Sequence, residues 1–183
     1  MPPEIFLSLG AQSAWRDPND ELLGQISRLG GIGPLPEHIA FCRFNSFKRI
    51  DEWEDHFRSD AHRSDLGMHA KHKAIEHWRA GCYDELIPAS KHLNCPCYYL
   101  EFLAPSKELN EPRFRAVLAE KGHKIGATVE FAIRRIGGLG PDPSDIVVWS
   151  GTPGSDVREL SSACGFCIAA AGFYENFRGA MGQ

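Results

Sequence analysis

The segment "ATVEFAIRRIGGLGPDPSDIVVWSG" (residues 127–151) decides the fold class, because it predicts two strands joined by a tight turn. Val129, Phe131 and Ile133 alternate with other residues, which is the period-two pattern of a strand with one buried face. A stretch rich in glycine and proline interrupts this pattern, and the apolar run "DIVVWSGT" (145–152) follows it. Together these features predict a β-hairpin.

The elements around this hairpin complete a regular order. "CYYLEFLA" (97–104) predicts a strand, and "NEPRFRAVLAEKGHKIG" (110–126) predicts a helix that begins at an asparagine cap and ends at glycines. After the hairpin, "SDVRELSSACG" (155–165) predicts a second helix and "CIAAAGFYENF" (167–177) a last strand. The resulting order is β-α-β-β-α-β, which is the ferredoxin-like order.

The amino-terminal part of the chain shows a similar succession. "EIFLSLGA" (4–11) predicts a strand, "DPNDELLGQISRLGGIG" (17–33) a helix, and "HIAFCRFNSF" (38–47) a strand followed by a helix. "CYDELIP" (82–88) predicts the closing strand, so one strand of the unit is short or missing. The sequence therefore predicts an α+β protein of two ferredoxin-like halves in tandem, residues 1–91 and 92–183. They are expected to form an α/β barrel within the chain or by dimerisation.

A resemblance to a known superfamily rests on the segment "RFNSFKRIDEWEDHFRSDAH" (43–62). It runs from strand to helix and contains Phe44, Ser46, an aromatic residue in the helix, Ser59 and His62. With the order of elements, this segment resembles the dimeric α/β-barrel superfamily, and within it stress-responsive A/B-barrel and NIPSNAP-like proteins. The resemblance implies two sheets that face each other across a closed cavity. Members include cofactor-free monooxygenases, isomerases, cyclases and haem enzymes, so the resemblance leaves the reaction open.

Composition narrows the classes of partner. A formal net charge of −4 and a pI near 6.1 give no basic field for a nucleic acid backbone. The first residues lack the basic start and long apolar run of a signal peptide, and no segment has the length of a membrane span. We expect a cytoplasmic protein with reduced thiols that binds a small molecule, contacts neither nucleic acid nor membrane, and forms a homodimer in one version of the barrel.

The segment "DHFRSDAHRSDLGMHAKHKAIEH" (55–77) holds five of the eight histidines. His69 and His72 lie on the helical side opposite the apolar residues, which predicts a solvated face. The alternative is a haem or metal protein that uses the segment from His56 to His77. A catalytic zinc site needs about three protein ligands, and no third ligand has suitable spacing. We therefore expect no metal site and no cofactor.

The cysteines offer a second metal or redox candidate, since "HLNCPC" (92–97) and "CGFC" (164–167) resemble two halves of one centre. In the predicted fold the strands that follow or precede these pairs are antiparallel neighbours. The pairs then lie at opposite ends, about 26 Å apart for eight residues of strand. We interpret them as separate thiols.

The strands supply the candidate site. In residues 98–103, alternation predicts one face of Tyr98, Leu100 and Phe102 and another of Tyr99, Glu101 and Leu103. In residues 128–134, it predicts one face of Val129, Phe131 and Ile133 and another of Thr128, Glu130, Ala132 and Arg134. We expect helices to cover the apolar face of each strand, so that the more polar faces look into the barrel.

This arrangement predicts catalytic residues Glu101, Glu130 and Arg134. A carboxylate desolvated in a partly apolar cavity suits proton transfer near neutral pH, and an arginine suits an anionic substrate. The expected substrate-binding residues are Arg43, Asn45, Tyr99 and Trp149. The protein is then a cofactor-free enzyme of proton-transfer, cyclase or oxygenase type, or a non-catalytic ligand-binding or stress-response module. In the alternative, the charges merely pair across a wet sheet.

Overall fold

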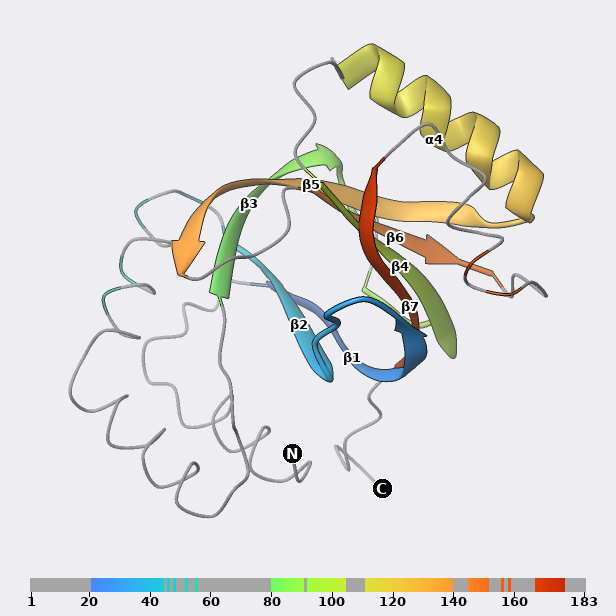
Figure 1. The fold of residues 1–183 in the computed structure, drawn as a ribbon. Helices are drawn as coiled ribbons and strands as arrows, with labels where there is room; N and C mark the ends of the chain where they lie inside the picture. The colour runs from blue at the N-terminus through green and yellow to red at the C-terminus, as the bar shows by residue number, and fades with distance from the viewer. Residues whose placement is uncertain are drawn as a thin grey trace. The chain divides into compact units, whose positions relative to one another are not determined.

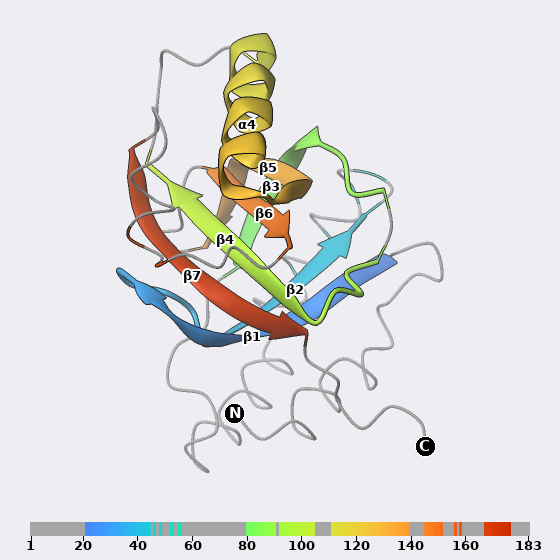
Figure 2. The ribbon, with the colours of Figure 1, turned by 90° about the vertical axis from the view of Figure 1, so that its right-hand side faces the viewer.

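The computed structural model describes part of the chain. The described residues are 21–44, 80–90, 92–104, 111–139, 145–151 and 167–176, with Ser46, Lys48, Glu52, Asp55, Asp156 and Arg158. The chain divides into two compact units, one of residues 1–21, 42–80 and 178–183 and one of residues 22–41 and 81–177. The second unit contains nearly all of a curled sheet and the helix packed on it (Figures 1 and 2).

The sheet has seven strands in the order β2-β1-β7-β4-β6-β5-β3. The pairs β1–β7, β4–β7, β4–β6 and β5–β6 are antiparallel. Helix α4 lies against the outside of the curl, over β4, β5 and β6 (Figure 2). The elements are β1 (Glu21–Ile32), β2 (His38–Arg43), β3 (Ala80–Ile87), β4 (Cys97–Leu103), α4 (Glu111–Ile125), β5 (Thr128–Leu139), β6 (Asp145–Ser150) and β7 (Ile168–Asn176).

The predicted fold class, an α+β protein of two ferredoxin-like halves, is wrong. The described strands of both predicted halves form one mostly β structure, a single curled sheet. β1 and β2 extend the sheet beyond β7, and β3 extends it beyond β5. The strands predicted at 97–104, 145–152 and 167–177 and the helix predicted at 110–126 are confirmed. The strand predicted at 4–11 lies outside the described residues.

The helix predicted at 17–33 is wrong for residues 21–32, and this error contributed to the wrong fold class. Residues 21–32 form β1, which pairs with β7 over Ile26 to Ile32. Three glycines in these twelve residues each cost a helix about 1 kcal/mol relative to alanine. In the strand Gly31 is required, because a Cβ on Gly31 would lie 2.4 Å from the carbonyl oxygen of Ala171. Glycine therefore permits the close approach of β1 and β7 at this point.

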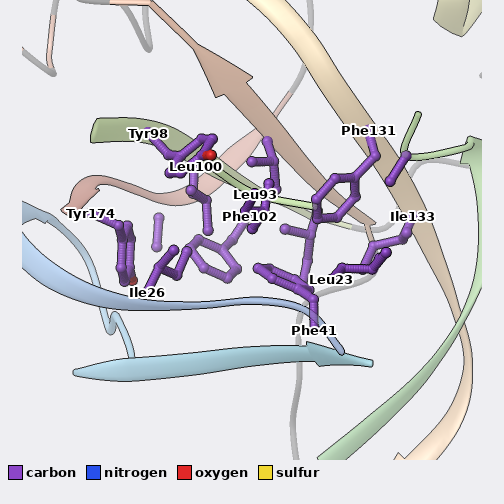
Figure 3. Close-up of a cluster of buried hydrophobic side chains, with 14 residues drawn as sticks. Leu23, Ile26, Phe41, Leu93, Tyr98, Leu100, Phe102, Phe131, Ile133 and Tyr174 are labelled. Carbon is purple, nitrogen blue, oxygen red and sulfur yellow. The ribbon is translucent and has the colours of Figure 1, made fainter. Parts of the chain in front are cut away.

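Hydrophobic side chains fill the inside of the curl (Figure 3). Side chains from β1, β2, β4, β5 and β7 point toward one another there, and the rings of Phe41 and Phe131 meet edge to face at 5.0 Å. We call this group the inner cluster: Leu23, Ile26, Phe41, Ala89, Leu93, Tyr98, Leu100, Phe102, Phe131, Ile133, Ile146, Val148, Ala170 and Tyr174.

A second group lies on the outer face of the sheet, under α4. We call it the outer cluster: Leu86, Tyr99, Leu103, Phe114, Leu118, Ala132, Val147, Trp149 and Ala171. The alternation predicted for β4 is confirmed, but the faces are reversed: Tyr98 points into the curl and Tyr99 points toward the helix. Within the described part of the chain, no helix has the length and hydropathy needed to cross a membrane.

A β-bulge changes the predicted alternation of β5. Val129 pairs with Trp149 and Phe131 pairs with Val148, so Glu130 is an extra residue in the ladder. Val129 therefore packs against the outer cluster, whereas Phe131 belongs to the inner cluster. The prediction that these two residues share a face is wrong, because the bulge shifts the register between them.

Candidate functional site

A buried carboxylate, that of Glu101, is the centre of the candidate site. It lies in the middle of β4 and its side chain is 0% exposed. Its Oε1 accepts a hydrogen bond of 3.0 Å from the Tyr99 hydroxyl and an ion-paired hydrogen bond from Nζ of Lys121. Its Oε2 accepts a hydrogen bond of 3.1 Å from Nε1 of Trp149. We call these four residues the Glu101 network.

The local structure explains why these side chains meet. Tyr99 and Glu101 are two residues apart on one face of β4, and Trp149 is the cross-strand partner of Tyr99 on β6. Lys121 comes from α4, on the same side of the helix as Phe114 and Leu118. Its ammonium nitrogen also lies 6.0 Å from the centroid of the Trp149 ring, within the range of a cation–π interaction.

The neighbouring Gly122 allows α4 to lie this close to the sheet. A Cβ at this position would lie 2.8 Å from the carbonyl oxygen of Ala127 and 3.2 Å from the Trp149 ring. The backbone amide of Ala127 donates to the carbonyl of Gly122 at 3.0 Å, which ends the helix. The carboxyl-terminal end of α4 is therefore seated directly on Trp149.

The Glu101 network is chemically closed. The charge of Glu101 is compensated by a lysine that is itself only 1% exposed, and both carboxylate oxygens accept bonds from protein donors. Burial of two ions costs several kcal/mol each, and only such close pairing and hydrogen bonding offsets that cost. Glu101 is therefore buried and held by Tyr99, Lys121 and Trp149 in the described part of the chain.

Glu130, the bulged residue of β5, lies in different surroundings. Its side chain is partly exposed, and its Oε1 is 3.9 Å from Sγ of Cys95. The backbone amide of Cys95 donates to the Tyr98 hydroxyl at 2.6 Å. Burial raises the pKa of the Tyr98 phenol well above its usual value, and the negative charge of Glu130 adds to this shift. At neutral pH this phenol stays protonated.

Arg134 is held by a different partner. Its Nε and terminal nitrogen donate to the two carboxylate oxygens of Asp145 at 3.0 and 3.1 Å. Its guanidinium carbon lies 6.0 Å from the centroid of the Phe114 ring, on the α4 side of the sheet. Such a two-pronged pair fixes the arginine in place. The structure therefore gives Glu101, Glu130 and Arg134 three separate sets of partners.

The structure does not bring all the predicted substrate-binding residues together. Tyr99 and Trp149 join Glu101, but they lie under α4 and not inside the barrel as predicted. Arg43 donates to the Glu21 carboxylate at 2.7 Å, and Asn45 lies outside the described residues. Sequence reasoning missed Lys121, although the signal was present: a lysine stands where the apolar residues of the helix repeat, in line with Phe114, Leu118 and Ile125.

The structure describes only some of the residues that were considered as metal ligands. The histidine segment falls in the part of the chain that the structure leaves undescribed, apart from Asp55, and Cys164 does as well. The predicted separation is confirmed for Cys97 and Cys167, since Cys97 pairs with Glu175 while Leu103 pairs with Ile168, next to Cys167. Burial raises the pKa of the Cys97 thiol. Among the described residues, no three His, Cys, Asp or Glu side chains are grouped so as to bind a metal ion.

Comparison with known proteins identified no related protein. The resemblance of residues 43–62 to the dimeric α/β-barrel superfamily thus stays a prediction. No protein-family model, no curated protein and no solved structure matches this chain.

Proposed function

We propose that this protein is a non-catalytic module that binds a small, partly apolar ligand. The observation that supports this proposal is the closure of the Glu101 network, in which the carboxylate best suited to chemistry is fully buried and bonded to Tyr99, Lys121 and Trp149. A general base must come within hydrogen-bond reach of the proton that it removes. The 0% exposure of Glu101 speaks against such a role.

The proposed contact for the ligand is Glu130. It is partly exposed, and its neighbour Cys95 packs against the inner cluster. Binding sites typically combine apolar walls with a few polar groups that orient the ligand. Glu130 supplies the polar group and the partly buried Cys95 an apolar contact, which favours a ligand with an apolar body and a hydrogen-bond donor or positive charge.

Chemical labelling of the native protein tests whether the Glu101 network is closed. Carbodiimide and glycine ethyl ester should modify Glu120, whose side chain is 67% exposed, and leave Glu101 unmodified. Acetic anhydride should modify Lys124, which is 55% exposed, and leave Lys121 unmodified. The two reactions are run on separate samples, and peptide mass spectrometry gives the ratio for each. Labelling of Glu101 at the rate of Glu120 would show that reagents reach the network, and a catalytic role would then be the better proposal.

A thermal-shift screen of small amines, alcohols and carboxylates with apolar groups tests binding itself. We expect amines or alcohols to raise the Tm of the wild type and to be recovered unchanged by mass spectrometry, because ligand binding to the native state stabilises it. Glu130→Gln should remove the shift, whereas Glu120→Gln, an exposed control, should keep it. Conversion of a bound compound would contradict the non-catalytic proposal. Ligand-induced shifts equal in wild type and Glu130→Gln would contradict Glu130 as the contact.

A further inference from the structure

We infer that the ion pair between Lys121 and Glu101 selects a single position of α4 on the sheet. This role of the ion pair requires no ligand. It rests on the fact that this pair links α4 to the sheet through a directional, fully buried contact: Lys121 is 1% exposed and Glu101 is 0% exposed.

The apolar contacts of α4 do not define its position by themselves. The side chains that it buries recur along one side of the helix, at Phe114, Leu118 and Lys121, with Ile125 partly buried. Below them lie aliphatic residues of the outer cluster, among them Leu86, Leu103, Ala132 and Val147. Hydrophobic burial is non-directional, so a helix moved along its axis by one turn, about 5.4 Å, keeps an apolar side toward an apolar surface.

The charges behave differently in such a shifted helix. Lys121 would move into the aliphatic part of the outer cluster, and Glu101 would keep only the bonds from Tyr99 and Trp149. Each ion would then be buried without its counterion, which is strongly unfavourable. Buried polar pairs are known to fix register in this way in other helical assemblies. The pair therefore penalises wrong positions of α4 more than it stabilises the right one.

Gly122 supports the same inference. Gly122 packs closely against the Trp149 ring because it has no Cβ. A shifted helix would place a different residue over this ring. Trp149, which packs against the helix backbone at Gly122, also donates a hydrogen bond to Glu101. Glu101 in turn pairs with Lys121. The position of α4 is thus defined by one connected site near its carboxyl-terminal end.

The test is a neutral replacement of the pair, Glu101→Gln with Lys121→Met. The introduced glutamine can still accept from Trp149 and donate to the Tyr99 hydroxyl, so the network within the sheet stays satisfied while the link to α4 is lost. We expect the double variant to melt within about 5 °C of the wild type, because a neutral, well-packed replacement of a buried ion pair is often tolerated. Amide hydrogen exchange of residues 118–125 should become at least tenfold faster, and α4 amides should give more than one set of NMR signals.

The matched control removes the exposed pair of the same helix, Glu120→Gln with Lys124→Met. Its ion pair has the same chemistry, at 2.6 Å, on the solvent side. Exchange of residues 118–125 should stay within twofold of the wild type. A Glu101→Gln, Lys121→Met variant with one set of signals and wild-type exchange in α4 would overturn the inference. So would failure to fold of this variant and of a second one, Glu101→Gln with Lys121→Leu, because the pair would then serve stability and not selection.

Discussion

Lys121→Met alone is expected to lower the free energy of unfolding by about 3–5 kcal/mol, because it leaves the buried carboxylate of Glu101 without its counterion. The methionine fills a similar volume, so the loss reports the unpaired charge and not an empty space. Urea denaturation followed by circular dichroism measures the change. The matched control, Lys124→Met, removes an exposed lysine one turn further along α4 and should change stability little.

Adding Glu101→Gln to Lys121→Met should recover most of this loss. The second change removes the uncompensated charge, so the two effects are strongly non-additive, and the double-mutant cycle gives a large coupling energy. A loss below about 1 kcal/mol for Lys121→Met would mean that water reaches Glu101. The carboxylate would then have to be reconsidered as an accessible group.

Phe114→Ala is expected to cost about 3–5 kcal/mol, the usual range for emptying a buried aromatic site. Phe114 is 0% exposed, belongs to the outer cluster and lies under the Arg134 guanidinium. Its removal leaves a cavity between the amino-terminal half of α4 and the sheet. Chemical denaturation gives the cost, and Phe114→Leu, which keeps most of the apolar volume, should lose clearly less. Equal losses for the two variants would show that the ring contributes its shape or its contact with Arg134, and not its volume.

Local patterns in the sequence predicted several parts of the structure correctly. The alternation in residues 98–103 separated Tyr98, Leu100 and Phe102 from Tyr99, Glu101 and Leu103, and the two clusters confirm it. Successive side chains of a strand must point to opposite faces, so this information is local. For the same reason, Glu101 and Tyr99 could be expected to meet. Trp149 joined them because β4 and β6 pair in the register that brings Tyr99 opposite Trp149.

Other features depended on contacts that a local pattern does not contain. Residues 21–32 carry apolar residues and glycines in an arrangement that also reads as a capped helix. Only pairing with β7, and the close approach of the two strands at Gly31, makes the strand the better state. The bulge at Glu130 is similar, because an extra residue in a ladder is defined by its partner strand. One such residue was enough to separate Val129 from Phe131.

The sequence by itself determined which side chains share a face of β4, where α4 begins and ends, and that Glu101 lies on a strand within reach of Tyr99. The tertiary structure alone decided that Glu101 faces the helix and not the inside of the curl, and that Lys121 is its counterion. The physical reason is that both faces of β4 are buried. Alternation separates the two faces, but it does not show which face packs against α4 and which lines the inside of the curl. That choice depends on the curvature of the whole sheet and on the helix that packs against it, which are sums of contacts between distant parts of the chain.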